Sequence, residues 1–357
     1  MSIEFNDRVE AIPVYPAAET YAFDGRLVKL ASNETPWEPL PEVIAAAEGA
    51  LRGLNRYPDP DKAELRRRIA GRCDVAPERV AVGNGSCEIL LAAATAMLEP
   101  GAEIVYAWPS FSMYPQLAAM TGARAVTVPL DAEGRHDLEA MAREVTHATR
   151  IVLVCNPNNP TATALPVAAI DAFAAELPDH VALVVDEAYV EFSTMQDPDE
   201  SLDLLRHHPN VVLLRTFSKV YGLCGLRVGY ALGPEPFRLA ADRVRQPFSV
   251  NAAAQAAAVE ALAHQDEVER RVERTAIERV HVQSELAERG LETTESHANF
   301  SWVSLGDRDE PEVVRGLAER GVIVRAGAAL GEEGRLRVTY GTRDENDRFL
   351  AALDELL

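Results

Sequence analysis

Short runs of branched apolar residues alternate with segments of helical periodicity through the first 250 residues. Strands are expected at residues 80–82, 103–107, 125–128, 150–155, 181–185, 211–216 and 227–231. Runs that are apolar throughout are typical of strands covered on both faces. Helices are expected between them at 87–98, 112–121, 137–144, 165–177 and 237–245. This alternation predicts an α/β fold, a three-layer αβα domain with a mostly parallel sheet.

The pattern changes after Pro247 and predicts a second, smaller α+β domain. Residues 251–290 lack Pro and Gly before their end and are expected to form two helices broken near 264–266. Shorter elements follow at 299–304, 311–319, 322–325 and 335–340, with a last helix from about residue 344. The proline-rich start predicts an arm or lid at 1–40 that packs on the small domain. The predicted domains are therefore 41–250 and 251–357.

Composition excludes several classes of function. The chain has 357 residues and a formal charge of −21, which disfavours nucleic acid and anionic lipid as partners. We expect no membrane span and no signal peptide, because no long apolar run occurs. Four isolated cysteines fit a reduced cytoplasm (Cys73, Cys87, Cys155 and Cys224). No metal-binding motif or serine-nucleophile motif is present, so we expect no metal.

A lysine follows the apolar strand expected at 211–216. Lys219 comes directly after the hydroxyl residues Thr216 and Ser218 and before a glycine-rich turn. Arg227, eight positions later, could hold a phosphate with its planar guanidinium. An amine beside a fixed cation and hydroxyl groups suits an imine-forming lysine, because a lowered pKa supplies the free base. A solvated surface lysine is the alternative.

A carboxylate ends the strand expected at 181–185. Asp186 precedes Lys219 by 33 positions (219 − 186), or one strand–helix–strand unit. Ligands of open α/β sheets bind at this edge, where a carboxylate can keep a pyridine nitrogen protonated. Tyr189 could reach a phenolic oxygen of the same ring. Taken alone, Asp186 could equally be a helix N-cap.

Three further segments follow predicted strands. Asn159 lies in an Asn-Pro cluster and could place its amide on the same oxygen, although such clusters usually form only a turn. Gly83-Asn84-Gly85-Ser86 opens a helix whose backbone N–H groups could bind one phosphate. Phe111 could stack on a flat cofactor, although an aromatic residue there is more often part of the core.

Together these residues resemble the fold-type I aminotransferases that use pyridoxal 5′-phosphate (PLP), and among them the histidinol-phosphate aminotransferase family. The matching motifs run in family order from residue 30 to residue 346: LASNETP (30–36), NRYPDP (55–60), NPNNPT (156–161), DEAY (186–189), TFSK (216–219), GLRVGY (225–230), ANF (298–300) and LRVTYGTRDEN (336–346).

The resemblance implies a role for each matching residue. Lys219 would form the Schiff base and move the proton, Asp186 would pair with the pyridinium, and Phe111 would stack on the ring. Tyr189 and Asn159 would bind the phenolate oxygen. The phosphate would be held by Gly85, Ser86, Cys87, Ser218 and Arg227. Tyr57 would reach the phosphate of the neighbouring subunit in a homodimer. Four residues would lie near the substrate: Tyr15, Asn33, Arg325 and Arg337.

Three positions depart from the family pattern. Cys87 stands where an acidic residue is usual, Ala162 where glycine is common, and Phe111 where tyrosine is frequent. A side-chain role for Cys87 is therefore in doubt, while the backbone amides of that turn remain available.

The leading hypothesis is reversible amino transfer between L-histidinol phosphate and 2-oxoglutarate by a ping-pong mechanism. The close alternative is an aromatic amino acid aminotransferase, because LASNET and the non-glycine residue after NPNNPT resemble that subgroup as well. A PLP-dependent amino-acid phosphate decarboxylase is a third hypothesis. A PLP-binding DNA regulator would need a basic helical module, which this sequence lacks.

Overall fold

The computed structural model describes residues 3–4, 6–12, 23 and 25–357. Its centre is a seven-stranded sheet in the order β2-β8-β7-β6-β5-β3-β4. All neighbouring strands are parallel except β8, which runs antiparallel to both β2 and β7. The α/β fold with a mostly parallel sheet is thus confirmed. The strands are β2 (Val80–Gly83), β3 (Glu103–Trp108), β4 (Arg124–Pro129), β5 (Thr149–Cys155), β6 (Ala182–Asp186), β7 (Val211–Thr216) and β8 (Gly229–Leu232).

Two apolar clusters explain why the central strands are apolar throughout. Val152 and Leu213 belong to one cluster, whereas their neighbours Leu153 and Val212 belong to the other. Successive side chains of a strand point to opposite faces, so both faces of this sheet are covered. The surrounding helices are α3 (Ser86–Met97), α4 (Tyr114–Thr121), α5 (Leu138–Arg143), α6 (Val167–Glu176), α7 (Leu204–His207) and α8 (Glu235–Val244).

Two helices precede the sheet and were not predicted from the sequence. They are α1 (Pro41–Leu51) and α2 (Ala63–Cys73), and both contact α9 (Ala252–Ala261). Alanines dominate α9, and Ala254, Ala257 and Ala258 are completely buried. Small side chains allow α1 and α2 to pack closely on this helix.

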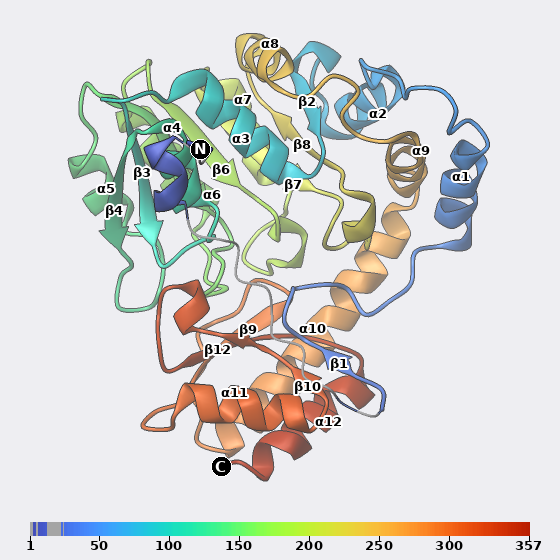
Figure 1. Cartoon of the computed structure of the whole chain (residues 1–357), viewed down its shortest axis with the longest axis vertical. Helices are drawn as coiled ribbons and strands as arrows, with labels where there is room; N and C mark the ends of the chain where they lie inside the picture. Colours follow the sequence, from blue (N-terminus) through green and yellow to red (C-terminus); the bar gives the residue numbers. More distant parts are fainter. Residues whose placement is uncertain (1–2, 5, 13–22, 24) are drawn as a thin grey trace.

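The C-terminal part is built on a three-stranded antiparallel sheet in the order β11-β12-β9. The long helix α10 (Gln265–Glu288) runs from the large sheet domain into this smaller unit (Figure 1). The other elements are β9 (Phe300–Ser304), α11 (Glu310–Glu319), β10 (Val322–Ile323), β11 (Arg325–Ala326), β12 (Arg335–Thr339) and α12 (Arg343–Asp354).

One predicted element of this unit was wrong. The single short element expected at 322–325 is in the structure two strands, because β10 pairs in parallel with β1 (Val28–Lys29) while β11 pairs with β12. Val28 and Leu30 are buried in the apolar cluster of the C-terminal unit. The segment before residue 40 therefore contributes to that core. The boundaries at residues 40 and 250 stay a prediction.

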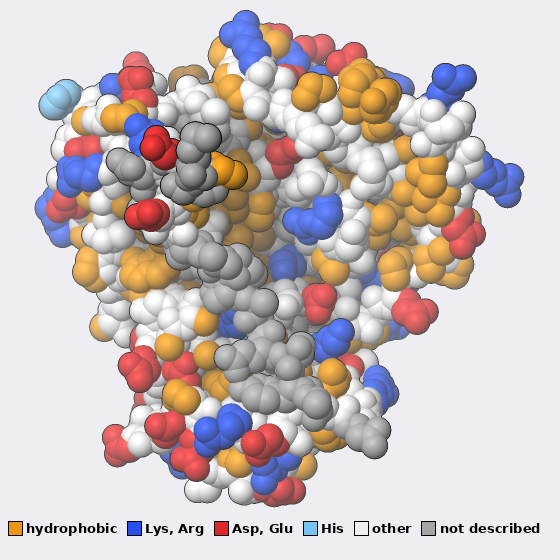
Figure 2. All heavy atoms as spheres, in the orientation of Figure 1, with side chains coloured by type: hydrophobic (Ala, Val, Ile, Leu, Met, Phe, Trp, Pro, Cys, Tyr) orange, Lys and Arg blue, Asp and Glu red, His pale blue; other side chains and the backbone are white. Residues whose placement is uncertain are grey.

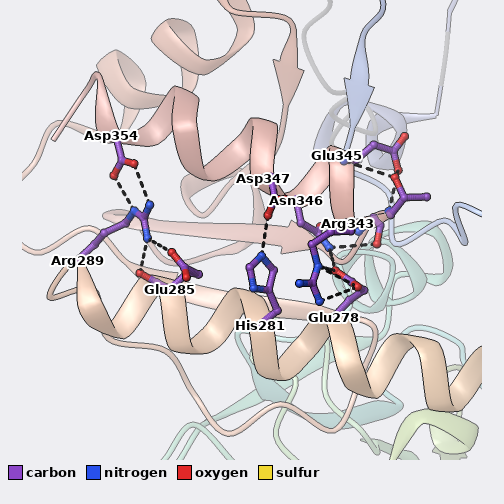
Figure 3. Close-up of polar contacts among 11 residues, drawn as sticks. Glu278, His281, Glu285, Arg289, Arg343, Glu345, Asn346, Asp347 and Asp354 are labelled. Atoms are coloured by element: carbon purple, nitrogen blue, oxygen red, sulfur yellow. Dashed lines mark hydrogen bonds and ion pairs between the residues drawn. The ribbon is translucent and has the colours of Figure 1, made fainter.

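Ion pairs join α10 to α12 (Figure 3). The guanidinium of Arg289 contacts Asp354 at 2.6 and 2.8 Å, and His281 Nε2 lies 2.7 Å from Asp347. Acidic and basic side chains are mixed over the C-terminal unit, at the bottom of Figure 2. Within the described part of the chain, no helix combines the length and apolarity needed to cross a membrane.

Candidate active site

A cavity of about 400 Å³ opens at the carboxyl ends of β5, β6 and β7. This is the edge at which open α/β sheets bind ligands. Nine of the residues predicted from the sequence line it: Ser86, Cys87, Phe111, Asn159, Asp186, Tyr189, Ser218, Lys219 and Arg227. These nine residues are spread from residue 86 to residue 227 and converge on one hollow, because the carboxyl ends of neighbouring parallel strands meet at one edge of the sheet.

Lys219 follows β7 and presents its amine to the cavity. Its Nζ donates to the backbone oxygen of Ser32 at 3.1 Å and lies 5.6 Å from the centre of the Tyr189 ring. Burial, reinforced by the Arg337 cation, lowers the pKa of Lys219 to about 8. Both effects disfavour the charged amine. More of this amine is therefore neutral at physiological pH than in an ordinary lysine.

Asp186 is the last residue of β6, and its side chain is buried. Its Oδ2 accepts a hydrogen bond from the phenol of Tyr114 at 3.0 Å. Its Oδ1 is buried without a hydrogen-bond partner among the described residues. Burial raises the pKa of Asp186 to about 6, although the Tyr114 hydrogen bond opposes this shift. A buried acceptor without a donor suits a ligand that brings its own N–H group.

The N-terminus of α3 forms a close-packed cradle. Gly85 has a φ of 76°, and a Cβ atom there would lie 2.6 Å from Nη2 of Arg227. A Cβ on Gly229 would lie 2.5 Å from the backbone nitrogen of Ser86. The two glycines therefore let Arg227 and the first turn of α3 come together. No side chain caps this helix, so its first N–H groups and the guanidinium are placed where they could hold an anion.

Arg227 itself differs from its predicted conformation. The strand was expected to begin at this residue, but β8 begins at Gly229. Arg227 has a φ of 60° and donates from Nη1 to the backbone oxygen of Cys224 at 2.8 Å. This left-handed backbone, uncommon outside glycine, directs the guanidinium toward Gly85.

Two polar contacts connect the cavity to the other parts of the chain. Nδ2 of Asn33 donates to the phenol oxygen of Tyr189 at 2.9 Å. Arg337, on β12, donates to Oδ1 of Asn159 at 2.6 Å and to the backbone oxygen of Ala31 at 2.6 Å. Asn33 and Arg337 thus contact residues that line the cavity, and their roles toward a substrate stay a prediction.

Two other predicted residues, Arg325 and Tyr57, do not line this cavity. Arg325 is buried and lies opposite Arg337 in the β11–β12 ladder. Tyr57 is 80% exposed and stacks on Phe248, with ring centres 4.4 Å apart. Tyr15 lies outside the described residues. The predicted roles of these residues remain predictions.

The structure describes the surroundings of the three residues that depart from the family pattern. Ala162 is completely buried with a φ of 63°, a conformation that favours glycine. Phe111 contacts the ring of Tyr114 edge-on at 5.7 Å. Burial and the Asp186 carboxylate raise the pKa of Cys87, which keeps its thiol neutral at physiological pH.

Sequence reasoning missed several residues at this site. Tyr114, which bonds Asp186, lies in the first turn of a correctly predicted helix, where its aromatic ring would be interpreted as core. The cavity also includes Ser32, Glu34, Cys155, Ala188, Thr216, Cys224 and Gly225. Within the described ranges, no group of three His, Cys, Asp or Glu side chains is placed to hold a metal.

Comparison with known proteins shows the family of this chain. Residues 26–353 match the family described as aminotransferase class I and II. The chain is 45% identical over 345 residues to an aromatic amino acid aminotransferase of Thermobifida fusca, covering 96% of this chain and 94% of that protein. It is 43% identical over 332 residues to a histidinol-phosphate aminotransferase of Moorella thermoacetica, covering 93% and 86%.

Solved structures with a similar fold are also aminotransferases. The structure of histidinol-phosphate aminotransferase from Sinorhizobium meliloti with pyridoxal 5′-phosphate has a TM-score of 0.87 at 28% identity, covering 100% of this chain and 98% of that one. Aspartate aminotransferase from Thermus thermophilus with maleate has a TM-score of 0.86 at 25% identity, with both chains fully covered. The fold and the site define an aminotransferase. This chain belongs to the aminotransferase class I and II family.

Proposed function

We propose that the cavity binds PLP and that the chain transfers an amino group between an L-amino acid and 2-oxoglutarate. The observation that carries the proposal is the pair Lys219 and Asp186. An amine with a lowered pKa and a buried carboxylate with one oxygen left open line the same cavity. The anion site at the start of α3 gives that cavity a place for a phosphate.

The residues present fit this cofactor. Oδ1 of Asp186 can accept the N–H of a pyridinium ring, and Phe111 offers an aromatic surface to a flat ligand. The amides of Ser86 and Cys87, together with Arg227, can hold a phosphate dianion. When bound, PLP would supply an aldehyde that accepts the amino group. Its ring would withdraw electrons from the reacting carbon of the substrate.

The protein side chains would control the protons of the reaction. Lys219, with a pKa of about 8, can hold or release a proton at Nζ near neutral pH. Asp186 would stay ionised once a cation binds its open oxygen, because an opposite charge offsets the cost of burial. Tyr189, held by Asn33, would place its hydroxyl against an oxygen of the ligand.

Two observations favour an aromatic amino acid as the amino donor. Relatives that are 45% and 41% identical over almost the whole chain carry the name aromatic amino acid aminotransferase. In addition, neither arginine lines the cavity, but Arg337 donates a hydrogen bond to Asn159, which does line it. One guanidinium suits the single α-carboxylate of such a substrate.

Histidinol phosphate is the second candidate. A relative of 43% identity and a solved structure of the same fold carry the name histidinol-phosphate aminotransferase. This substrate has a phosphate and no carboxylate, so it would draw on both Arg325 and Arg337, which lie opposite each other in the β11–β12 ladder. The two candidate substrates therefore differ in whether Arg325 takes part in binding the substrate.

A substrate competition assay tests the proposal. Purified enzyme with PLP and 2-oxoglutarate is given phenylalanine, tyrosine or histidinol phosphate, and glutamate formation is measured. We expect kcat/KM to be highest for an aromatic amino acid. A preference of tenfold or more for histidinol phosphate would reverse the order of the candidates. Carbon dioxide release without 2-oxoglutarate would support the decarboxylase hypothesis instead.

Conservative arginine variants sharpen the assay. With an aromatic substrate, Arg337→Lys should lower kcat/KM about a hundredfold, because lysine cannot replace a bidentate carboxylate contact. Arg325→Lys is the matched control and should change it less than threefold. If histidinol phosphate is the substrate, both variants should lower its turnover.

We further propose that the enzyme is a cytoplasmic homodimer with shared active sites. Tyr57 and Phe248 form an exposed aromatic stack outside the cavity of their own chain. Phe248 and Val250 have φ values of 57° and 69°, which is strained for such bulky residues. A strained loop that holds an exposed tyrosine suits a contact with a second copy of this chain.

A further inference from the structure

Tyr114 is the residue of this site for which neither the sequence motifs nor the family resemblance suggested a role. It is completely buried at the start of α4. Its phenol donates to Oδ2 of Asp186 at 3.0 Å. A buried tyrosine usually finds a partner for its hydroxyl. Here that partner is the carboxylate proposed to bind the cofactor ring.

The ring of Tyr114 is fixed from two sides. It meets Tyr106 with ring centres 5.8 Å apart at 62°, and Phe111 with ring centres 5.7 Å apart at 88°. Edge-to-face contacts of this kind hold aromatic rings in one orientation. Tyr114 therefore contacts both Phe111 and Asp186, and these two residues line the cavity.

The two oxygens of Asp186 are thereby distinguished. Oδ2 is occupied by Tyr114, while Oδ1 is buried and has no partner among the described residues. Rotation of the carboxylate would break a charge-assisted hydrogen bond inside the protein, where such bonds are strong. The phenol thus occupies Oδ2 and leaves Oδ1 available to a ligand.

We propose that Tyr114 is a positioning residue, which holds Asp186 ionised and oriented so that its open oxygen pairs with the ring nitrogen of PLP. The inference rests on the proposed function, because it assigns Tyr114 a role toward the cofactor of that reaction. Tyr114 acts through Asp186 and touches no reacting atom. The direction of the effect follows from the phenol, which donates a stronger hydrogen bond to the ionised carboxylate than to its protonated form.

The test is a double-mutant cycle on PLP affinity. The parent enzyme, Tyr114→Phe, Asp186→Asn and the double variant are freed of cofactor and titrated with PLP, and the dissociation constant is read from absorbance. Phenylalanine keeps the ring and removes only the hydroxyl. We expect Tyr114→Phe to weaken PLP binding about tenfold, the typical effect of one hydrogen bond to a charged group.

The cycle separates positioning from packing. In the Asp186→Asn background, adding Tyr114→Phe should change PLP affinity less than twofold, because the group it acts on is already altered. Tyr106→Phe is the control, since it removes another buried hydroxyl of the same aromatic cluster. It should bind PLP like the parent enzyme. Thermal unfolding of the cofactor-free forms checks that all variants fold.

Each outcome has a distinct meaning. If Tyr114→Phe binds PLP like the parent while Asp186→Asn does not, the positioning role is wrong and the proposed function stands. A tenfold loss that persists in the Asp186→Asn background would also overturn it, because the tyrosine would then act by packing alone. If the parent enzyme binds no PLP, the proposed function itself fails.

Discussion

The side-chain amide of Asn33 donates a hydrogen bond of 2.9 Å to the phenol oxygen of Tyr189, 156 positions later in the chain. Asn33 has a φ of 54°, and its backbone nitrogen donates to Oγ1 of Thr339 at 2.9 Å. The segment that follows β1 is thus bonded both to the cavity and to the C-terminal sheet. Asn33 therefore links Tyr189, which lines the cavity, to the C-terminal sheet.

Replacement of Asn33 should therefore lower activity for two separable reasons. Asn33→Ala removes the amide and places alanine in a left-handed backbone, which costs about 1 kcal/mol. Asn33→Gly removes the same amide without that strain. We expect both variants to lose about tenfold in kcat/KM, but only the alanine variant to lose stability in urea. Full activity of the glycine variant would show that the Tyr189 contact is dispensable.

Lys219→Ala should abolish both turnover and the covalent attachment of PLP. The chain has only three lysines (Lys29, Lys62 and Lys219), so attachment is easily mapped. Borohydride reduction of the PLP-loaded parent followed by peptide mass analysis should place the adduct on Lys219. Lys29→Ala, on an exposed position of β1, is the control and should leave attachment and activity intact. An adduct on Lys29 or Lys62 would contradict the assignment.

Much of the fold could be predicted because its pattern is local. β3, β5 and β7 were expected within one residue at each end, since continuous apolar runs mark strands buried on both faces. β10 and β11 were not separated, because the change of partner at Val324 depends on β1, some 300 residues earlier. No local window contains such a pairing.

The site was predictable where a motif follows a strand. Asp186 ends a strand, and Asn159 and Lys219 follow the two neighbouring strands, so the topology brings all three to one edge. Tyr114 could not be identified in this way, because its hydroxyl meets Asp186 only through the packing of α4 on the sheet. The sequence pattern shows which face of a helix a residue lies on. It does not show which group the hydroxyl of that residue contacts.

Asp186→Asn should stabilise the cofactor-free protein at neutral pH. Burial raises the pKa of Asp186 from 3.8 to about 6, so the folded state binds the proton more tightly than the unfolded state. The stability that this group contributes is present below pH 3.8 and is lost as pH rises through 6. An asparagine avoids that loss. We expect the variant to gain on the order of 2 kcal/mol at pH 7.5, with no gain below pH 4.

Thermal unfolding measured across pH, with and without PLP, checks whether Asp186→Asn raises or lowers the stability of the protein. Asp242→Asn is the contrast, because Asp242 pairs with Arg66, Arg238 and Arg245 and its pKa is lowered. That variant should be less stable at pH 7.5, and the difference should shrink as pH falls. With PLP bound, the advantage of Asp186→Asn should disappear. A variant less stable than the parent without cofactor would refute the argument.

Mixing two defective variants tests the shared site. Tyr57→Ala and Lys219→Ala homodimers should each be impaired, the first in PLP retention and the second in chemistry. A hybrid dimer would have one site in which the intact Lys219 of one chain meets the intact Tyr57 of the other. We therefore expect activity to return after the two proteins are unfolded together and refolded. Because Tyr57 is exposed and lies outside the cavity of its own chain, a single-chain site would give no such recovery. Mixing Lys219→Ala with Asp186→Asn is the control, since these two residues share one cavity within a chain and their hybrid gains no intact site.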